Sequence, residues 1–278
     1  MDNNQAKPLY IITGATDAMG SIITQRLAEA GHALVMACFD NEKSEAKAKE
    51  IAIQTRNNDI TSLHLDLGSF ESVKKFVADV KALNRPVAAL VNNASYISRK
   101  SEISPDGYEK LVQVNFLSTV LLTMLIKPLM IEGGRVIFST SISRHLVSIP
   151  YEFPKVNNFM PIAAFAQSKM ALSLFSIYLS TIYRTHHIVV NSVDSGIINL
   201  SMVRLNRIFN KFDLFARNSN STETGAKAMM RAIESTDTGF IFKGGDKQIK
   251  ASTLLKNREV FVKLCNDTMR LLKKHLDE

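Results

Sequence analysis

The chain has 278 residues, which is enough for one large domain or two small ones. Hydrophobic residues make up 46% of it and charged residues 22%, so the composition excludes disordered and fibrous proteins. The net charge of +8 favours anionic ligands. The sequence contains no nucleic-acid-binding module, however, so we expect no nucleic acid partner.

Targeting and metal signals are also missing from the sequence. The N-terminal residues MDNNQAKPLY do not resemble a signal peptide, and the longest apolar run, 120–130, is interrupted by polar residues and a proline. We therefore expect no membrane span. Cys38 and Cys265 lack the spacing of a zinc or redox site, and His186-His187 has no acidic or cysteine partner nearby, so we expect no metal. Two isolated cysteines suit a reducing compartment, which predicts a cytoplasmic protein.

Apolar strands alternate with helices along the chain. A strand at 9–13, a helix at 19–30 that stops at Gly31, and a strand at 33–38 form a βαβ unit. Strands that are apolar on both faces predict an α/β fold, a doubly wound parallel sheet with helices on both faces. No linker interrupts the alternation, so we expect a single domain over 1–278. The further helices are expected at 42–56, 69–83, 105–131 and 161–184, and the further strands at 61–65, 87–91, 135–139 and 188–193.

Polar residues follow five of these strands, at the sheet edge where such folds bind ligands. The first strand runs into TGATDAMG, in which Gly14 allows a tight turn and Gly20 allows close helix packing. The helix that follows offers free N–H groups to a phosphate, although a plain turn explains the same glycines. The other polar ends are Asp66, Asn92-Asn93-Ala94, Ser139-Thr140-Ser141 and Asp194-Ser195-Gly196.

The apolar helix at 161–184 carries a single lysine, Lys169, and Phe165 lies on the same face one turn earlier. A buried ammonium is costly unless a partner compensates it. Two interpretations follow: Lys169 binds a ligand, or it extends to a solvated edge of the helix.

Together these motifs resemble those of the short-chain dehydrogenase/reductase family, from TGATDAMG to GFIFKGG, over essentially the whole chain. TGATDAMG is similar to the family's TGxxxGxG, with Ala18 at the middle glycine, and NNAS at 92–95 is similar to NNAG. The resemblance implies a single-domain Rossmann-type fold and an NAD(P)-dependent oxidoreductase that acts on a carbonyl or alcohol.

The resemblance also implies roles for individual residues. Ser141 corresponds to the catalytic serine, Lys169 to the catalytic lysine, and Asn115 in VNFLST to the proton-relay asparagine. Asp66 in LDL corresponds to the aspartate that contacts the adenine. The implied cofactor-binding residues are Thr13, Gly14, Asp17, Met19, Gly20, Phe39, Asp66, Leu67, Asn92, Asn93, Ala94, Ser139, Lys169, Ser195, Gly196 and Ile198.

Phe165 departs from the family's YxxxK motif, which here reads FAQSK. A phenyl ring has no O–H group, so it cannot exchange the proton that accompanies hydride transfer. The segment Tyr151 to Lys155 also fits YxxxK, but Pro154 would break the helix that the motif requires. Tyr151 is therefore either an ordinary loop residue or a substitute acid that reaches the site from its loop.

The long gap between Ser141 and the lysine helix, and the stretch VMACFDNEKSEA, resemble the retinol dehydrogenase-like branch of the family. That branch usually has an arginine, which favours NADP, at the position of Phe39, whereas an aspartate at the position of Cys38 would favour NAD. Neither is present, although Asp40 and Lys43 lie nearby. The branch resemblance and the basic charge favour NADP, and NAD stays open.

The C-terminal third suggests a lid and a docked helix. By resemblance, 201–217 is a substrate lid over an apolar pocket, although a surface helix or an interfacial helix has the same pattern. Residues 251–278 predict an amphipathic C-terminal helix. Family members often pair through the helices after the fourth and fifth strands, which implies a homodimer or homotetramer, but core packing explains the same apolar residues.

Two functions compete. The first is an oxidoreductase that is weak because Phe165 replaces the catalytic tyrosine. The second is a non-catalytic dinucleotide-binding or scaffold protein on the same fold, favoured by the accumulated departures. These are Ala18, Phe39, Ser95, Phe165 and Ser195.

Overall fold

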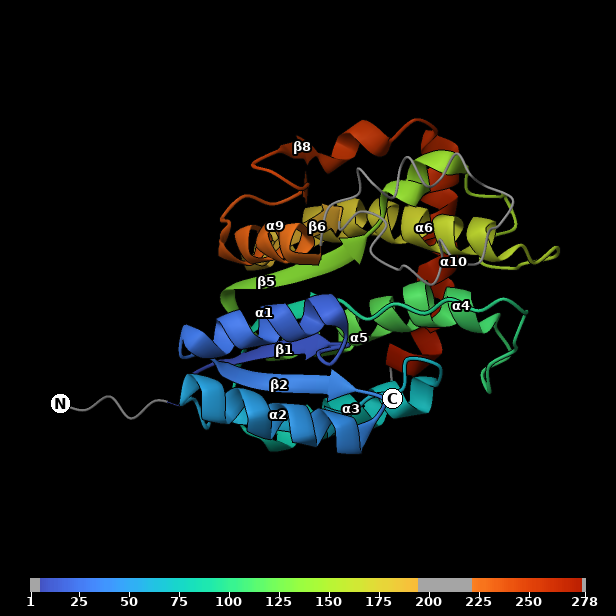
Figure 1. Ribbon diagram of the computed structural model, residues 1–278. Coiled ribbons are helices and arrows are strands. Elements are labelled where there is room, and N and C mark those ends of the chain that lie inside the picture. Colours follow the sequence, from blue (N-terminus) through green and yellow to red (C-terminus); the bar gives the residue numbers. More distant parts are fainter. Residues whose placement is uncertain (1–5, 195–221, 277–278) are drawn as a thin grey trace.

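The computed structural model describes residues 6–194 and 222–276. Within these residues a single eight-stranded sheet runs through the molecule in the order β3-β2-β1-β4-β5-β6-β7-β8 (Figure 1). All neighbouring strands are parallel except β7 and β8. This order confirms the doubly wound α/β fold. The strands are β1 Leu9–Thr13, β2 Ala33–Cys38, β3 Ile60–His64, β4 Val87–Asn92, β5 Met130–Thr140, β6 Val189–Asp194, β7 Phe240–Phe242 and β8 Gln248–Lys250.

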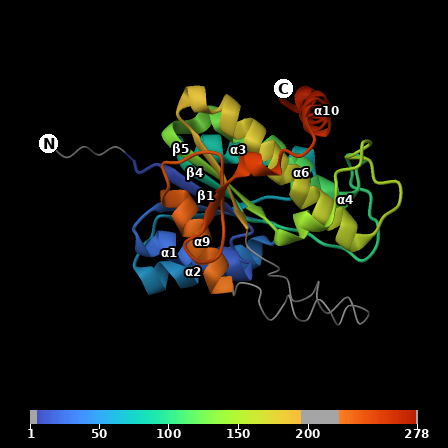
Figure 2. The ribbon, with the colours of Figure 1, turned by 90° about the horizontal axis from the view of Figure 1, so that it is seen from above.

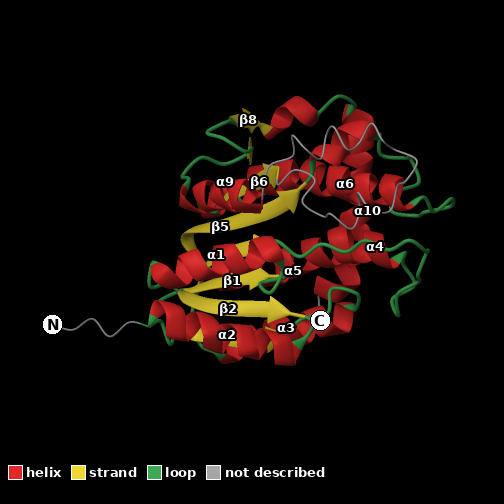
Figure 3. Cartoon of the chain, in the orientation of Figure 1, coloured by secondary structure: helices red, strands yellow, loops and turns green. Residues whose placement is uncertain are grey.

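Helices cover both faces of the sheet (Figures 2 and 3). One core cluster joins the sheet to α1 (Ala18–Glu29), α2 (Asn41–Thr55) and α9 (Thr222–Glu234). The other cluster joins it to α3 (Phe70–Ala82), α5 (Ser118–Ile126), α6 (Pro161–Ile182) and α10 (Arg258–Leu276). Because β2 and β4 are buried along their whole length, both sides of the sheet need this cover.

The helix predicted at 105–131 was wrong at its start and in its regularity. Residues 105–108 form a turn in which Gly107 has a φ of 84°, and Glu109 then caps the helix by accepting a hydrogen bond from the Val112 N–H at 3.1 Å. Three residues of α4 (Lys110–Val112) lead into a π-helical segment, η1 (Gln113–Leu117), and only then into α5. A 3₁₀ turn, η2 (Lys127–Leu129), joins α5 to β5, which starts five residues earlier than expected.

The C-terminal helix begins at Arg258, and the residues before it form a 3₁₀ turn, η5 (Ala251–Leu254). The predicted helix at 251–278 was therefore too long at its start. α10 packs on both α5 and α6, and Leu264, Cys265 and Leu272 enter the same core cluster as Phe175. α10 thus covers part of the surface of α5 and α6 within one chain.

Two helical stretches have the length and apolar composition of membrane spans. They are Lys110–Leu129 and Pro161–Ile182, of which 78% and 72%, respectively, are buried inside the protein. Core helices of a folded domain have the same properties, so these two stretches are weak evidence for a membrane span.

Candidate cofactor and active site

The glycine turn after β1 brings two backbone segments into close contact. Gly14 has a φ of 61°, in the left-handed region that favours glycine. A Cβ atom on Gly20 would lie only 2.1 Å from the Gly14 carbonyl oxygen. The first turn of α1 therefore packs directly on the loop, and its N-terminus opens at the carboxyl edge of the sheet. That geometry suits a phosphate group.

Thr13 ties this turn to the carboxyl end of β4. Its Oγ1 accepts hydrogen bonds from the N–H groups of Asn93 and Ala94, both at 3.0 Å. The Asn93 side chain returns the contact by donating to the Gly14 carbonyl at 3.1 Å. From the sequence these residues were expected only to contact the cofactor. In the structure they also bind to one another and so connect the ends of β1 and β4.

Aromatic residues and a carboxylate lie at the ends of β2 and β3. Phe39 is 70% exposed, and its ring centroid lies 5.9 Å from that of His64. Asp66 accepts a hydrogen bond from the Gly68 N–H at 2.7 Å, whereas the Leu67 side chain packs in the core. His64 was not expected at this edge from the sequence, although its position at the end of β3, two residues before Asp66, places it there.

Lys169 is buried at the centre of the site. The residue is 2% exposed, and its Nζ donates a hydrogen bond to the Ser139 carbonyl at the end of β5, at 3.1 Å. Burial lowers the pKa of Lys169 to about 8, because the neutral amine is cheaper to desolvate than the ammonium. The structure therefore rejects the interpretation that Lys169 extends to a solvated edge.

Phe165 stands next to this lysine. The Lys169 Nζ lies 5.6 Å from the centroid of the Phe165 ring, close enough for a cation–π contact. Phe165 is 7% exposed and packs against Leu111 and Ala164, with Phe159 at the edge of the cluster. The phenyl ring thus occupies an apolar niche beside the amine.

Asn115 lies in the π-helical segment, a feature that is frequent at functional sites. Its Oδ1 accepts a hydrogen bond from the Tyr96 N–H at 2.8 Å, and its Nδ2 donates to the Tyr96 carbonyl at 2.7 Å. Nδ2 also lies 3.4 Å from the Ser168 Oγ on α6. Asn115 therefore holds the chain after β4 against the lysine helix.

Ser141 follows β5 and is linked to a buried ion pair. Its Oγ accepts a hydrogen bond from the Ser143 N–H at 3.2 Å, and its carbonyl accepts one from Arg144 at 2.8 Å. Arg144 is fully buried and pairs with Asp194 at the end of β6, at 3.1 Å. The sequence analysis missed Arg144, because a single arginine after a strand carries no motif.

These residues lie at or near the carboxyl edge of the sheet. The family model for short chain dehydrogenases matches residues 9–208, more than half of the chain. The chain belongs to the short-chain dehydrogenase family.

Individual relatives agree with this family assignment. The chain is 32% identical to mouse polyprenol dehydrogenase over 203 residues, which cover 70% of this chain and 61% of the relative. It is also 32% identical to human retinol dehydrogenase 13 over 199 residues, which cover 70% and 60%. The branch resemblance is thus confirmed, and the chain spans about three fifths of the length of these relatives.

Solved structures show the same fold at lower identity. A crystal structure of an uncharacterised protein from Mycobacterium paratuberculosis has a TM-score of 0.77 at 21% identity, covering 97% of this chain and 94% of that one. A short chain dehydrogenase from Salmonella enterica has a TM-score of 0.67 at 20% identity, covering 86% and 96%.

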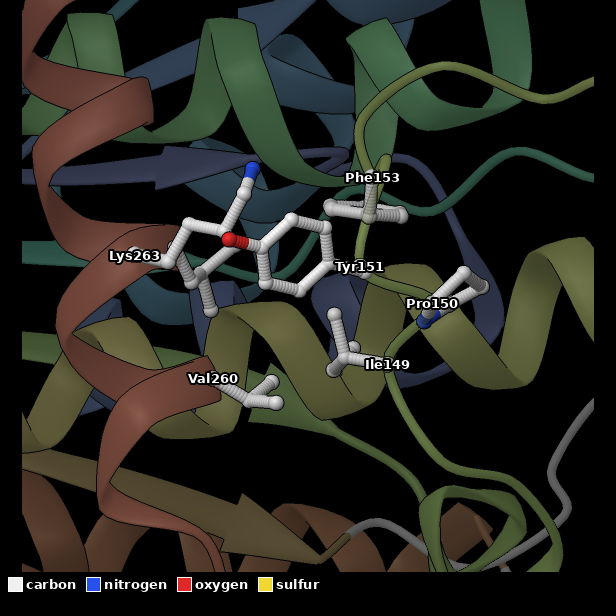
Figure 4. A pocket seen from close by; sticks show the side chains of 7 residues that line it. Ile149, Pro150, Tyr151, Phe153, Val260 and Lys263 are labelled. Atoms are coloured by element: carbon white, nitrogen blue, oxygen red, sulfur yellow. The ribbon is translucent and has the colours of Figure 1, made fainter.

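Tyr151 lies away from Ser141 and Lys169. Residues 151–154 form a turn, as the proline predicted, and Tyr151 is 61% exposed. Its ring lies against the outer helix α10, with the Lys263 Nζ 4.6 Å from the ring centroid (Figure 4). The hollow beside it is lined by Ile149, Phe153 and Val260, and by neither Ser141 nor Lys169. Tyr151 is therefore a poor substitute acid.

Some of the other predicted site residues lie within the described residues and some lie outside them. Met19 is a buried residue of α1, and Asn92 donates a hydrogen bond to Thr123 at 3.1 Å. Ser195, Gly196, Ile198 and the predicted lid at 201–217 lie outside the described residues. The roles of all these residues in binding stay predictions.

The buried lysine predicts a distinctive dependence of stability on pH. Between pH 8 and 10, Lys169 is deprotonated in the folded state but still protonated when unfolded, so the free energy of unfolding rises with pH. The contribution is up to about 1.4 kcal/mol per pH unit. Urea unfolding of the wild type and of Lys169→Met isolates it, because other titrating groups are common to both. Parallel pH curves for the two proteins would contradict this assignment.

Asp17 predicts a penalty on phosphate binding. Its Oδ2 lies 2.7 Å from where a Cβ of Gly14 would stand, over the turn that faces the phosphate site. Desolvation raises the pKa of this carboxyl and nearby Lys43 lowers it. Asp17→Ser removes the negative charge, so we expect calorimetry to show roughly tenfold tighter NADPH and NADH binding, with Asp79→Ser on α3 as the unaffected control. Weaker binding would instead mean that the carboxylate contacts the cofactor.

Proposed function

We propose that the protein is an NAD(P)-dependent oxidoreductase that acts on a carbonyl or alcohol. The observation that carries the proposal is Lys169, whose amine is buried at the carboxyl edge of the sheet and, within the described residues, donates a hydrogen bond to the Ser139 carbonyl. A group of this kind suits a hydroxyl-rich ligand such as a cofactor ribose. The nicotinamide cofactor would supply or accept the hydride, and the fitting residues around it are the glycine turn, Thr13 and Asn93.

The other residues support substrate positioning. Ser141 would hydrogen-bond the carbonyl oxygen, with its backbone fixed by Arg144. Asn115 would keep the loop after β4 against α6. The missing proton donor is replaced by water or by Lys169 itself, since an amine with a pKa of about 8 is protonated at neutral pH and can donate. The resulting enzyme is slow.

A non-catalytic dinucleotide-binding protein is the second candidate. Phe165 fills the tyrosine's place with an apolar ring that is packed on three sides, and Asp17 sets a negative charge over the phosphate turn. Both features weaken chemistry or binding while leaving the fold intact. The relatives named as dehydrogenases favour the enzyme over this alternative.

Restoring the hydroxyl separates the two candidates. We expect Phe165→Tyr to raise the rate of NADPH-dependent reduction of aldehydes and ketones by about 10²–10⁴-fold, because it returns a general acid next to Lys169. Turnover is followed by the loss of NADPH absorbance or by product analysis. Phe261→Tyr on α10 is the matched control and should change nothing. If the Phe165→Tyr variant binds the cofactor but shows no turnover, the result would support the non-catalytic candidate.

We propose NADP as the preferred cofactor. Lys43 at the start of α2 is exposed and close enough to Asp17, in the glycine turn, to lower the pKa of that carboxyl. His64 is exposed beside Phe39 and adds a second nitrogen-bearing side chain there. A 2′-phosphate would meet these groups, and Cys38 stands at the position where an aspartate would favour NAD. Asp40 lies two residues further on and caps α2 by accepting a hydrogen bond from the Lys43 N–H at 3.0 Å. Phe39 would offer an apolar face to the adenine.

Lys43→Ala tests this preference. Loss of the ammonium should weaken NADPH binding about tenfold and leave NADH binding unchanged, because only NADPH carries the 2′-phosphate. Calorimetric titration with both nucleotides measures the effect, and Lys49→Ala, an exposed lysine on the same helix, is the control. An equal loss of affinity for NADPH and NADH would show that Lys43 does not recognise the 2′-phosphate.

Substrate, assembly and location follow from the same observations. The names of the relatives refer to retinol and polyprenol, which supports an apolar alcohol or aldehyde as substrate. The packing of α10 on α5 and α6 favours a monomer over the homodimer or homotetramer implied by the family. Cys38 and Cys265 are buried and unpaired, which supports a reducing cytoplasmic location.

A further inference from the structure

A second pocket lies beside the active site, between the loop after β5 and the C-terminal elements. Its volume is about 480 Å³, within the range of small-molecule sites. It is lined by the 3₁₀ turn η3 (Ile142–Leu146) and the chain after it, by α6, and by η5 with the start of α10. Ser141, Phe165 and Lys169 are not among the lining residues.

The walls of this pocket are largely apolar. Met170 and Leu174 come from α6, one turn apart on a face that adjoins the one carrying Phe165 and Lys169. Ile149, Leu254 and Val260 complete the apolar surface from three other elements. Elongated apolar ligands are suited to such a surface, because each methylene that it removes from water stabilises binding.

The polar end of the pocket carries positive charge. Arg144, His145 and Lys256 line it, and no acidic residue is among the described residues that do. Lys256 is exposed and joins no ion pair within residues 6–194 and 222–276, and Lys243 is near enough to affect His145. Asp194 compensates Arg144 but not Lys256. The electrostatic potential in the pocket is therefore positive, which favours a negatively charged ligand.

Two further groups favour an anion there. Arg144 is completely buried, and although its two terminal nitrogens are bonded, its Nε has no hydrogen-bond partner among the described residues. A buried donor without a partner is costly, which points to a ligand that completes it. Asn257, another lining residue, accepts a hydrogen bond from the Val260 N–H at 3.1 Å, so the positive end of the α10 dipole also faces the pocket.

We propose that this pocket binds an anionic amphiphile, an alkyl chain that carries a carboxylate head. The chain lies along Met170 and Leu174, and the carboxylate lies between Arg144 and Lys256. Neither a short anion nor a neutral chain satisfies both ends. This site is distinct from the carbonyl or alcohol site of the proposed function and does not depend on it.

Calorimetric titration without nucleotide tests the proposal, with laurate below its micelle concentration, dodecanol and acetate as ligands. We expect saturable binding of laurate, at least tenfold weaker binding of dodecanol, and no binding of acetate. Equal binding of dodecanol would overturn recognition of the charge. Acetate binding as strong as that of laurate would overturn recognition of the chain.

Variants locate the site. Met170→Trp fills the apolar end and Lys256→Glu reverses the charge at the rim, so each should weaken laurate binding at least tenfold. Ile53→Trp on α2 and Lys247→Glu in the chain before β8 are exposed matched controls that should bind as the wild type does. Circular dichroism confirms that each variant is folded. Unchanged affinity in both pocket variants would overturn the proposal.

Lys169→Met separates this site from the active site. Laurate binding should be unaffected, since Lys169 does not line the pocket. Loss of laurate binding in this variant would place the ligand in the active site and overturn the proposal. A failure of laurate binding in the wild type would leave NADPH binding and turnover untouched, so the two proposals fail independently.

Discussion

The site depends on one constraint, an amine held out of water at the carboxyl edge of the sheet. Lys169 can be buried only because α6 packs tightly over β5 and presents the amine to the Ser139 carbonyl. A single neutral acceptor compensates an ammonium incompletely, which is why its pKa falls to about 8. A polar ligand that accepts a hydrogen bond from this amine would lower the cost of burying its charge.

The supporting framework keeps that amine in place from several directions. Asn115 joins the loop after β4 to α6, Thr13 joins the ends of β1 and β4, and Arg144 joins the ends of β5 and β6 through Ser141 and Asp194. Each contact links elements that are far apart in sequence but adjacent at one edge of the sheet. Phe165 fits into this framework as a packed ring, in a cluster with Leu111 and Ala164.

Periodicity was enough to predict the alternation of strands and helices. It failed where a tertiary contact decides local structure. The π-helical segment around Asn115 replaces a regular helix without any signal in its apolar sequence, and β8 is too short to show alternation. The pairing of Arg144 with Asp194 and the capture of Tyr151 by Lys263 join residues dozens of positions apart, which no local pattern reports.

The position of α10 has a consequence for how the protein is made. Leu264, Cys265 and Leu272 belong to the same core cluster as residues of β1, which lies near the other end of the chain, and of β4. During synthesis, the apolar faces of α5 and α6 emerge well before the helix that covers them, because α5 ends at residue 126 and α6 at residue 182, whereas α10 begins only at residue 258. The nascent domain must therefore hold an uncovered apolar surface on the ribosome until its last helix appears, a period in which chaperones have a ready target.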